Sequence, residues 1–500
     1  MRPRLGVDLA ATFNLVGGLV KYLSLAPLIP AAVATGYGES PAPFLLATAI
    51  GFFCGWTMER LSYGKKQVGM REGFLVVSLT WLLAAMVGAL PYWLTAEAQF
   101  ASPIDSYFEA MSGFTTTGAT IVTDIEALPH GLAMWRQLTQ WFGGMGIIVL
   151  ALAVLPRLRV GGRQLLETEL PGPEIQEMTL RIRETAQRLW LLYIALTALM
   201  IVVLSVIAWT GLDATMSFYE AVAHALTTLP TGGFSTRARS LEEFGAASQW
   251  AIAFFMVVAG ANFALLYRAF FRRQPRVFVR DEEFRLYLVL LMLGAALLAV
   301  ELLSEGVLRG EAAVRHSVVN AVSVMTTTGY ASADFNEWPL LAAIVIVALM
   351  FVGGSAGSTS GSVKVVRHLL LGRILRRELD QTVHPEVVAR IHFNRRAVDE
   401  RIVRAVSSFV LLYVGVFAAG TLLLVMDAAR VDSGIGLLDA VAVSASALGN
   451  VGPALGVAGP MGSYETFSSL SKGLLIVLMW IGRLEIIPVA IILTRGYWRV

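Results

Sequence analysis

Four short segments of this 500-residue chain share one pattern. Each begins with an acid or amide just before an alanine and ends in a step from threonine or valine to glycine, at Gly118, Gly232, Gly329 and Gly452. Such long-period self-similarity indicates an internal repeat. Glycine reaches backbone torsions that are closed to other residues, and an extended segment after a helix can turn its carbonyl groups toward a common axis. Rings of carbonyl oxygens replace the hydration shell of a small cation. The pattern therefore predicts a cation-binding filter.

Each copy is expected to contribute four residues, and the threonines add hydroxyl oxygens. A short helix that ends at the axis also directs the partly negative end of its dipole toward a cation. The alternative is four unrelated turns with ordinary glycine and threonine. The predicted filter residues are Thr116, Thr117, Gly118, Ala119, Pro230, Thr231, Gly232, Gly233, Thr327, Thr328, Gly329, Tyr330, Asn450, Val451, Gly452 and Pro453.

The acid or amide that leads each segment has two interpretations. These residues are Glu109, Glu220, Asn320 and Asp439. Each could cap the N-terminus of its short helix, where negative charge is stabilised. Each could instead attract cations at the mouth of the pore. We favour capping.

A run of ten small residues, 353–362, interrupts one apolar segment. Glycine costs about 1 kcal/mol relative to alanine inside a helix, so a continuous helix is not expected here. We expect a gating loop below the filter, although a helix-packing surface or an exposed cytoplasmic linker would also explain the composition. The predicted gate residues are Gly353, Gly354, Ser355, Ala356, Gly357, Ser358, Thr359, Ser360, Gly361 and Arg483.

Arg483 lies near the middle of the last apolar segment. An arginine at the centre of a membrane span costs roughly 2.5–3.5 kcal/mol on insertion scales and faces protein or water. We expect its guanidinium under the filter, opposing ion passage, and the alternative is a structural ion pair with another helix. Lys472 and Arg136, near the ends of their segments, are interpreted as simple anchors, and Lys21 as a residue of a helix interface or one that reaches the membrane surface.

The elements that must position these residues are membrane spans. The chain is 56% hydrophobic and 15% charged, far from the composition of a soluble domain. Its apolar residues form runs near the roughly 20 residues that a spanning helix needs. We therefore expect an all-α polytopic membrane protein, and the predicted spans are 12–34, 41–59, 72–94, 134–155, 188–210, 248–270, 284–304, 338–372, 402–426 and 471–494.

The distribution of arginine and lysine orients these spans. Ten crossings place every basic cluster on one side, so the positive-inside rule predicts that both termini are cytoplasmic. The four filter segments then enter from the outside. The first span resembles a signal peptide only loosely, because Asn14 and Lys21 interrupt its apolar run.

Several function classes are not supported by the residues. The net charge of +3 does not suggest nucleic-acid binding. Cys54 is expected to be a small buried hydrophobe, since a single thiol makes no internal disulfide. The six histidines show no metal-ligand spacing, and no nucleophile motif appears, so we predict neither an enzyme nor a cofactor site in this chain.

Further motifs carry a resemblance to a known family. They are 140–149 (QWFGGMGIIV), 260–263 (GANF) and 482–485 (GRLE). Together with the four glycine segments, they resemble the Trk/Ktr/HKT superfamily of K⁺ transporters, and two extra spans at the start resemble its TrkH branch. The resemblance implies four pseudo-symmetric helix–pore loop–helix repeats around one pore, preceded by two transmembrane helices. The expected boundaries are 1–70 for those helices, then 71–165, 185–280, 281–395 with the broken helix and gating loop, and 396–500.

The resemblance also implies a function. It suggests potassium uptake across a bacterial inner (plasma) membrane by a gated, channel-like permease, and it associates glycine at the Gly118 position with K⁺ selectivity. A Na⁺-permeable protein or an H⁺- or Na⁺-coupled symporter of the same architecture remains the alternative. The family further implies a homodimer bound to cytosolic TrkA-type subunits, and any nucleotide, NAD or ATP/ADP, would bind to those subunits. Only the central glycine is shared by all four segments, so we expect a shorter filter than that of tetrameric channels.

Overall fold

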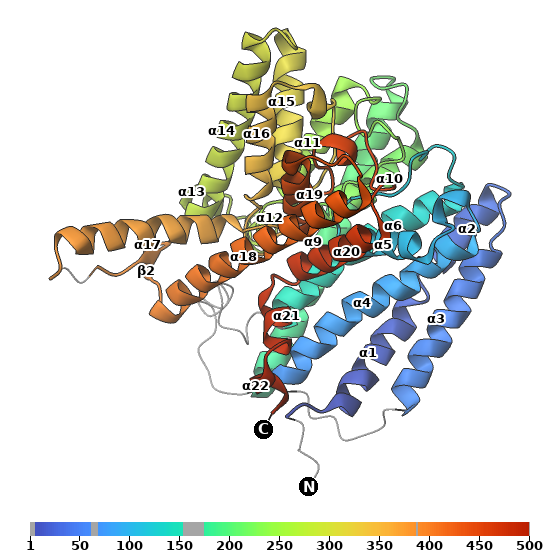
Figure 1. Cartoon of the computed structure of the whole chain (residues 1–500), viewed down its shortest axis with the longest axis horizontal. Helices are drawn as coiled ribbons and strands as arrows, with labels where there is room; N and C mark the ends of the chain where they lie inside the picture. Colours follow the sequence, from blue (N-terminus) through green and yellow to red (C-terminus); the bar gives the residue numbers. More distant parts are fainter. Residues whose placement is uncertain (1–5, 62–68, 154–174, 387–388, 500) are drawn as a thin grey trace.

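The computed structural model describes residues 6–61, 69–153, 175–386 and 389–499, and within them the chain is helical apart from short turns and one small hairpin. The first helices are α1 (Leu9–Leu23), α2 (Leu28–Gly36) and α3 (Ala42–Leu61). Four units follow in which a short helix lies between longer ones (Figure 1). The boundary expected at residue 165 and the basic residues Arg157, Arg159 and Arg163 lie outside the described residues.

The four units have the following elements. The first comprises α4 (Met70–Leu94), α5 (Pro103–Phe114) and α6 (His130–Ala153). The second comprises α9 (Ile175–Trp209), α10 (Phe218–Thr228), α11 (Ala246–Ala259), α12 (Phe263–Phe270) and α13 (Arg276–Arg280). The third comprises α14 (Glu282–Ser304), α15 (Gly310–Met325), α16 (Leu340–Met350), α17 (Val365–Val383) and the hairpin β1 (His392–Phe393) and β2 (Arg396–Ala397). The fourth comprises α18 (Glu400–Val431), α19 (Leu437–Gly449), α20 (Ser469–Arg483), α21 (Ile487–Ile492) and α22 (Arg495–Trp498).

Length and apolar composition would let six helices of the described chain cross a membrane, and a seventh span is counted if the bent pair α11–α12 is one. The six are Leu9–Gly36, Ala42–Leu61, Met70–Leu94, Glu184–Trp209, Glu282–Ser304 and Glu400–Val431. The chain is therefore a multi-pass membrane protein. The remaining predicted spans correspond to α6 and to the shorter helices α16 and α20.

Besides the first predicted span, which consists of α1 and α2, two spans that were predicted as continuous are broken. The segment 248–270 bends by 102° between α11 and α12, because Gly260 ends one helix and the Asn262 side chain caps the next by accepting from Ala264 N and Leu265 N. The segment 471–494 breaks after α20, where Glu485 and Ile486 have left-handed torsions (φ 55° and 62°). The break predicted in the eighth span is present between α16 and α17.

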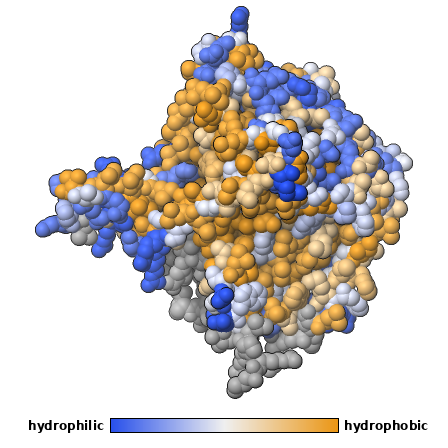
Figure 2. All heavy atoms as spheres, viewed as in Figure 1, coloured by the Kyte–Doolittle hydropathy of each residue, from blue (hydrophilic) through white to orange (hydrophobic). Residues whose placement is uncertain are grey.

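The short helices α5, α10, α15 and α19 lie at the centre and are mostly buried, whereas the longer helices face outward. Outward-facing apolar side chains such as Val202, Leu293 and Leu422 are exposed. Figure 2 shows the resulting broad hydrophobic surface, which is what a lipid-facing protein presents. Cys54 was expected to be buried, and this prediction is wrong, because Cys54 is exposed on the outermost helix α3.

The two ends of the described chain lie together. Gly6 N donates to Trp498 O at 3.1 Å, and the Arg71 side chain donates to Arg499 O at 2.9 Å. Lys21 of α1 pairs with Glu59 of α3 at 2.5 Å, which fits the first of its two interpretations, a place in a protein interface. An even number of crossings would leave both ends on the same side, in agreement with this contact.

Candidate functional site: a ring of four glycines on a central axis

Each of the four central helices is followed by the same backbone conformation. Within three residues of the end of each helix, a left-handed residue occurs at Thr116, Thr231, Thr327 and Asn450 (φ 52°, 55°, 57° and 54°). Two residues further on, a left-handed glycine occurs at Gly118, Gly233, Gly329 and Gly452 (φ 84°, 78°, 83° and 105°). These torsions make the four segments structurally equivalent, although their sequences differ.

The torsions correct the alignment of the second repeat by one residue. The threonine-to-glycine step pointed to Gly232 as the central glycine, but Gly233 has the left-handed torsion that Gly118 has. Phe234, which is buried, therefore corresponds to Tyr330, and Pro230 precedes the equivalent segment. Sequence alone could not separate two adjacent glycines, because both satisfy the same pattern.

The four glycines form a closed ring. A Cβ atom added to Gly118 would lie within 3.0 Å of the carbonyl oxygen of Gly232, in the second repeat. A Cβ atom added to the left-handed glycine of the second repeat likewise meets a carbonyl oxygen of the third repeat. The same holds from the third repeat to the fourth and from the fourth back to the first. The remaining pairs are Gly233 with Thr328 O, Gly329 with Val451 O, and Gly452 with Thr117 O. In every pair, the carbonyl belongs to the residue just before the next glycine, so the repeats surround one axis.

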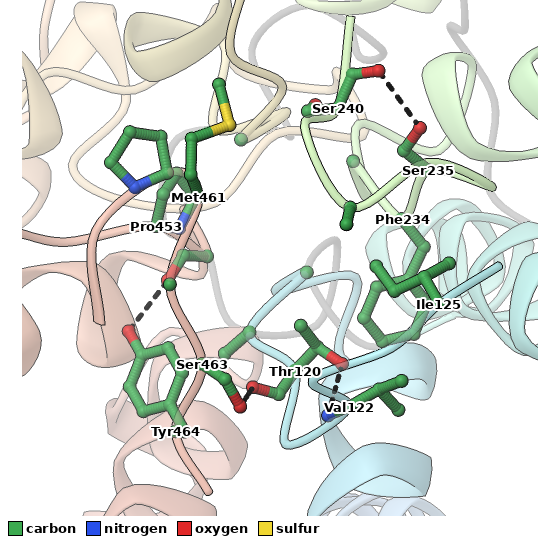
Figure 3. A pocket seen from close by; sticks show the side chains of 18 of the residues that line it. Thr120, Val122, Ile125, Phe234, Ser235, Ser240, Pro453, Met461, Ser463 and Tyr464 are labelled. Carbon is green, nitrogen blue, oxygen red and sulfur yellow. Dashed lines mark hydrogen bonds between the residues drawn. The ribbon is translucent and has the colours of Figure 1, made fainter. Parts of the chain in front are cut away.

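A cavity of about 270 Å³ lies on one side of this ring (Figure 3). All four glycines line it, together with residues that follow them, such as Thr120, Ser235 and Tyr464. The Tyr464 hydroxyl donates to Gly452 O at 2.7 Å and so helps to hold the fourth segment in place. In the first, second and fourth repeats the other lining residues follow the glycine, so the cavity lies beyond the ring as seen from the helix ends.

Arg136 was interpreted as an anchor at a span end, and this is wrong. Its side chain is fully buried and pairs with buried Glu109 at 2.8 Å. It also donates to Ser235 O (3.2 Å) and to the Thr120 hydroxyl (3.3 Å), and its guanidinium lies 4.2 Å from the ring centre of Phe234. Arg136 therefore ties the segment after Gly118 to the segment after Gly233.

The capping role proposed for the leading acids holds for one of the four. Asp439 accepts from Gly436 N at the start of α19, as a cap does. Glu109 instead accepts from Thr120 and Ile121 N, Glu220 from Thr236, and the Asn320 side chain donates to Ser332. These three residues brace the segment after the filter rather than the helix start. Glu109 and Asn320 lie too far along their helices to cap them.

The corresponding residue of the second repeat is His224, which the sequence analysis did not single out as a site residue. It stands nine positions before its glycine, as Glu109 and Asn320 do, and its Nε2 lies 3.2 Å from the Ser235 hydroxyl. The spacing from Gly233 would have identified it, but the spacing from Gly232 did not.

The loop between α16 and α17 lies on the other side of the ring. Its residues 353–364 are buried apart from 356 and 357, so it is not an exposed linker. Thr359 donates to Leu229 O of the second repeat (3.0 Å), and Gly361 N donates to the Thr327 hydroxyl of the third (2.7 Å). A Cβ on Gly361 would meet Gly449 O of the fourth. These three contacts are with residues that precede the ring glycines, so the ring lies between the loop and the cavity.

Arg483 contacts this loop directly. Its side chain is 2% exposed, and it donates to Thr359 O at 2.8 Å and to Gly143 O of the first repeat at 3.3 Å. Within the described residues its hydrogen bonds go to carbonyl groups and not to a carboxylate, which does not match the alternative of a structural ion pair. The neighbouring Glu485 pairs instead with Arg367 of α17.

Lys472 was also interpreted as an anchor, and the structure corrects this. It is buried and pairs with Asp105 at 2.6 Å. Asp105 is in the first turn of α5, so the pair joins α20 of the fourth repeat to the short helix of the first. The fourth and first repeats are thus joined by an ion pair as well as by the backbone contact between Gly452 and Thr117.

Among the described residues, no group of three or more histidine, cysteine, aspartate or glutamate side chains is placed to hold a metal ion. The oxygen atoms that the four segments carry are those of backbone carbonyls, threonine hydroxyls and the Asn450 amide. Such neutral oxygens suit a weakly bound monovalent cation.

Comparison with known proteins gives one family. The sequence profile of the TrkH family, described as a cation transport protein, matches residues 47–496. The Trk system potassium uptake protein TrkH of Escherichia coli (strain K12) is 36% identical over 498 residues, which cover 98% of this chain and 99% of that protein. TrkG of the same organism is 31% identical over 490 residues, covering 97% and 98%. The crystal structure of the potassium transporter TrkH from Vibrio parahaemolyticus has a TM-score of 0.87 and 34% identity, and the match covers 99% of this chain and 100% of that one. This chain therefore belongs to the TrkH family of cation transport proteins.

Proposed function

We propose that this protein takes potassium into a bacterial cell across the inner membrane as a gated, channel-like permease. The closed ring of Gly118, Gly233, Gly329 and Gly452 is the observation that carries the proposal. The names of the relatives support it, because those proteins are called potassium uptake proteins. The negative interior of a cell would draw K⁺ inward with about 2.3 kcal/mol per charge for each 100 mV.

The filter consists of the four left-handed segments. In the part of the chain that the structure describes, no donor bonds to the carbonyl oxygens of Thr117, Thr328 or Val451, although all three residues are buried. A buried carbonyl without a partner is costly, and a dehydrated cation supplies that partner. The equivalent Gly232 carbonyl accepts from the Gln140 side chain at 2.7 Å, so the second repeat is braced differently from the others.

The gate consists of the loop 353–361 and Arg483. The loop lies against residues of three repeats, and Arg483 connects it to the first. An ion that leaves the filter would therefore meet peptide groups and a fixed positive charge. Ion flux requires that the loop and the guanidinium move aside.

The wider assembly is proposed from the family. A homodimer is supported by the exposed apolar face of α17, on which Leu375, Leu379 and Val383 lie one turn apart. The name Trk system suggests cytosolic regulatory subunits. TrkA-type subunits with NAD or ATP/ADP would act on α17, which leads directly from the loop. Both termini would be cytoplasmic, and the repeat boundaries would be those given by the sequence.

Ion flux through the purified protein in liposomes tests this function. We expect uptake of K⁺ and Rb⁺ well above that of Na⁺, driven by the gradient of the ion itself. Equal Na⁺ flux would establish the Na⁺-permeable alternative, and uptake that requires a pH or Na⁺ gradient would establish a coupled symporter. Uptake that survives replacement of all four ring glycines would exclude the filter.

A further inference from the structure

Glu283, near the start of α14, makes contacts that the sequence does not suggest. Its side chain is 2% exposed. One carboxyl oxygen, Oε1, accepts from the backbone N–H groups of Ala356 at 2.5 Å and Val366 at 3.2 Å. No ion pair holds this carboxyl group within the described residues, so its direct bonds are to the main chain.

One of the two amides, that of Ala356, lies within the gating loop, and the other, that of Val366, lies just after it. Ala356 is at the beginning of the loop's turn, next to Ser355, whose N–H donates to Gly260 O at 2.9 Å. Val366 is in the first turn of α17, where helix N–H groups lack partners in the helix and a negative group is stabilised. A single oxygen atom therefore joins the turn of the loop to the start of the helix that follows it.

The preceding residue, Glu282, contacts the same helix further along. Arg373 of α17 donates to Glu282 Oε2 at 2.8 Å, and Asn394 N, in the turn of the β1–β2 hairpin, donates to the same oxygen at 3.2 Å. The Arg373 side chain also donates to His392 O of the hairpin. Two adjacent carboxyl groups of α14 thus hold α17 at two points, one beside the loop and one beside the hairpin.

We propose that Glu283 is the positioning residue that keeps the loop closed and transmits movement of α17 to it. This inference rests on the proposed gate. When α17 shifts away from α14, Val366 N leaves the Glu283 carboxyl group, and the hold on Ala356 weakens with it. The loop then loses one of its attachments, while the contact between Thr359 and Arg483 remains.

The test compares three changes at this position in the full-length protein in liposomes. Glu283→Ala removes the acceptor, and Glu283→Asp keeps the carboxyl group but withdraws its oxygen atoms by one methylene, so that they no longer reach both amides. Both are expected to raise basal K⁺ flux about tenfold, which corresponds to about 1.4 kcal/mol. Glu283→Gln retains an accepting oxygen and should stay close to the wild type. Glu301→Gln, on the same helix but away from the loop, is the matched control.

Hydrogen exchange gives a second readout that altered stability alone would not produce. The amides of Ala356 and Val366 should exchange faster in Glu283→Asp, while those of α15 should keep their wild-type protection. Unchanged flux and unchanged exchange at these two amides in Glu283→Asp would overturn the inference. This variant decides the question even if Glu283→Ala does not fold.

A deletion of residues 355–361 separates this inference from the gate itself. If the gate proposal is right, the deletion raises basal flux, and adding Glu283→Asp raises it no further. A deletion without effect on flux would refute the gate. A deletion that raises flux, together with an inert Glu283→Asp, would refute only the role of Glu283.

Discussion

Replacing Gly233 with alanine should damage ion conduction far more than replacing Gly232. Gly233 has φ 78°, a left-handed torsion that costs other residues roughly 1–2 kcal/mol. Its added Cβ would lie 2.9 Å from the carbonyl carbon of Thr328 and nearer still to the oxygen. These are backbone atoms of the next repeat, and they cannot rotate away as the end of a side chain could. Overpacking of this kind costs about 1–3 kcal/mol.

The two costs sum to on the order of 2–5 kcal/mol, and they act on the ring itself. About 1.4 kcal/mol corresponds to a tenfold change in an equilibrium constant. We therefore expect Gly233→Ala to lower K⁺ flux at least 30-fold or to abolish selectivity over Na⁺. At Gly232 the atoms that an added Cβ would meet belong to the Gln140 side chain, and the backbone is not left-handed. Gly232→Ala should thus be milder, and Gln140→Ala should partly restore it by making room.

The assay is uptake of K⁺ and Na⁺ into liposomes that contain equal amounts of each variant. Gln140→Ala alone is the control, because it removes the bond to Gly232 O without adding a methyl group. If Gly233→Ala conducts K⁺ selectively while Gly232→Ala does not, the alignment of the second repeat given above is wrong. Rescue of Gly233→Ala by Gln140→Ala would contradict the reasoning equally.

Three further predictions concern buried charge. Arg136→Met should destabilise the protein by about 3–5 kcal/mol because it leaves Glu109 buried without its cation, and adding Glu109→Gln should recover part of the loss in thermal unfolding. Should the double variant unfold earlier than the single one, the pair is not the source of the effect. Lys472→Met should cost less than Arg136→Met in the same measurement, since Asp105 is 17% exposed and Glu109 is not exposed at all. Arg483→Gln should raise basal K⁺ flux about tenfold, because the fixed charge beside Thr359 O is lost; flux at the wild-type level would leave Arg483 with a structural role only.

Several features of the chain were predictable because they depend on local composition. Long apolar runs indicated spans, since lipid accepts only backbone that is hydrogen-bonded within its own helix. The ten small residues at 353–362 indicated a broken helix, and the break lies there. The repeated pattern around the glycines indicated segments with special torsions, which all four have. Each of these features can be read from neighbouring residues alone.

Other features were decided only by the packing of the repeats. The sequence could not show that Gly233 rather than Gly232 joins the ring, because that depends on which carbonyl of the third repeat comes close. It also could not show that Arg136 binds Glu109, or that one oxygen of Glu283 holds amides 73 and 83 positions away in the chain. A buried charge pairs with whichever group the fold brings near it, and a buried charge left without a partner destabilises the protein strongly. The sequence thus determined where the chain crosses, breaks and repeats, and the tertiary structure determined which polar groups meet.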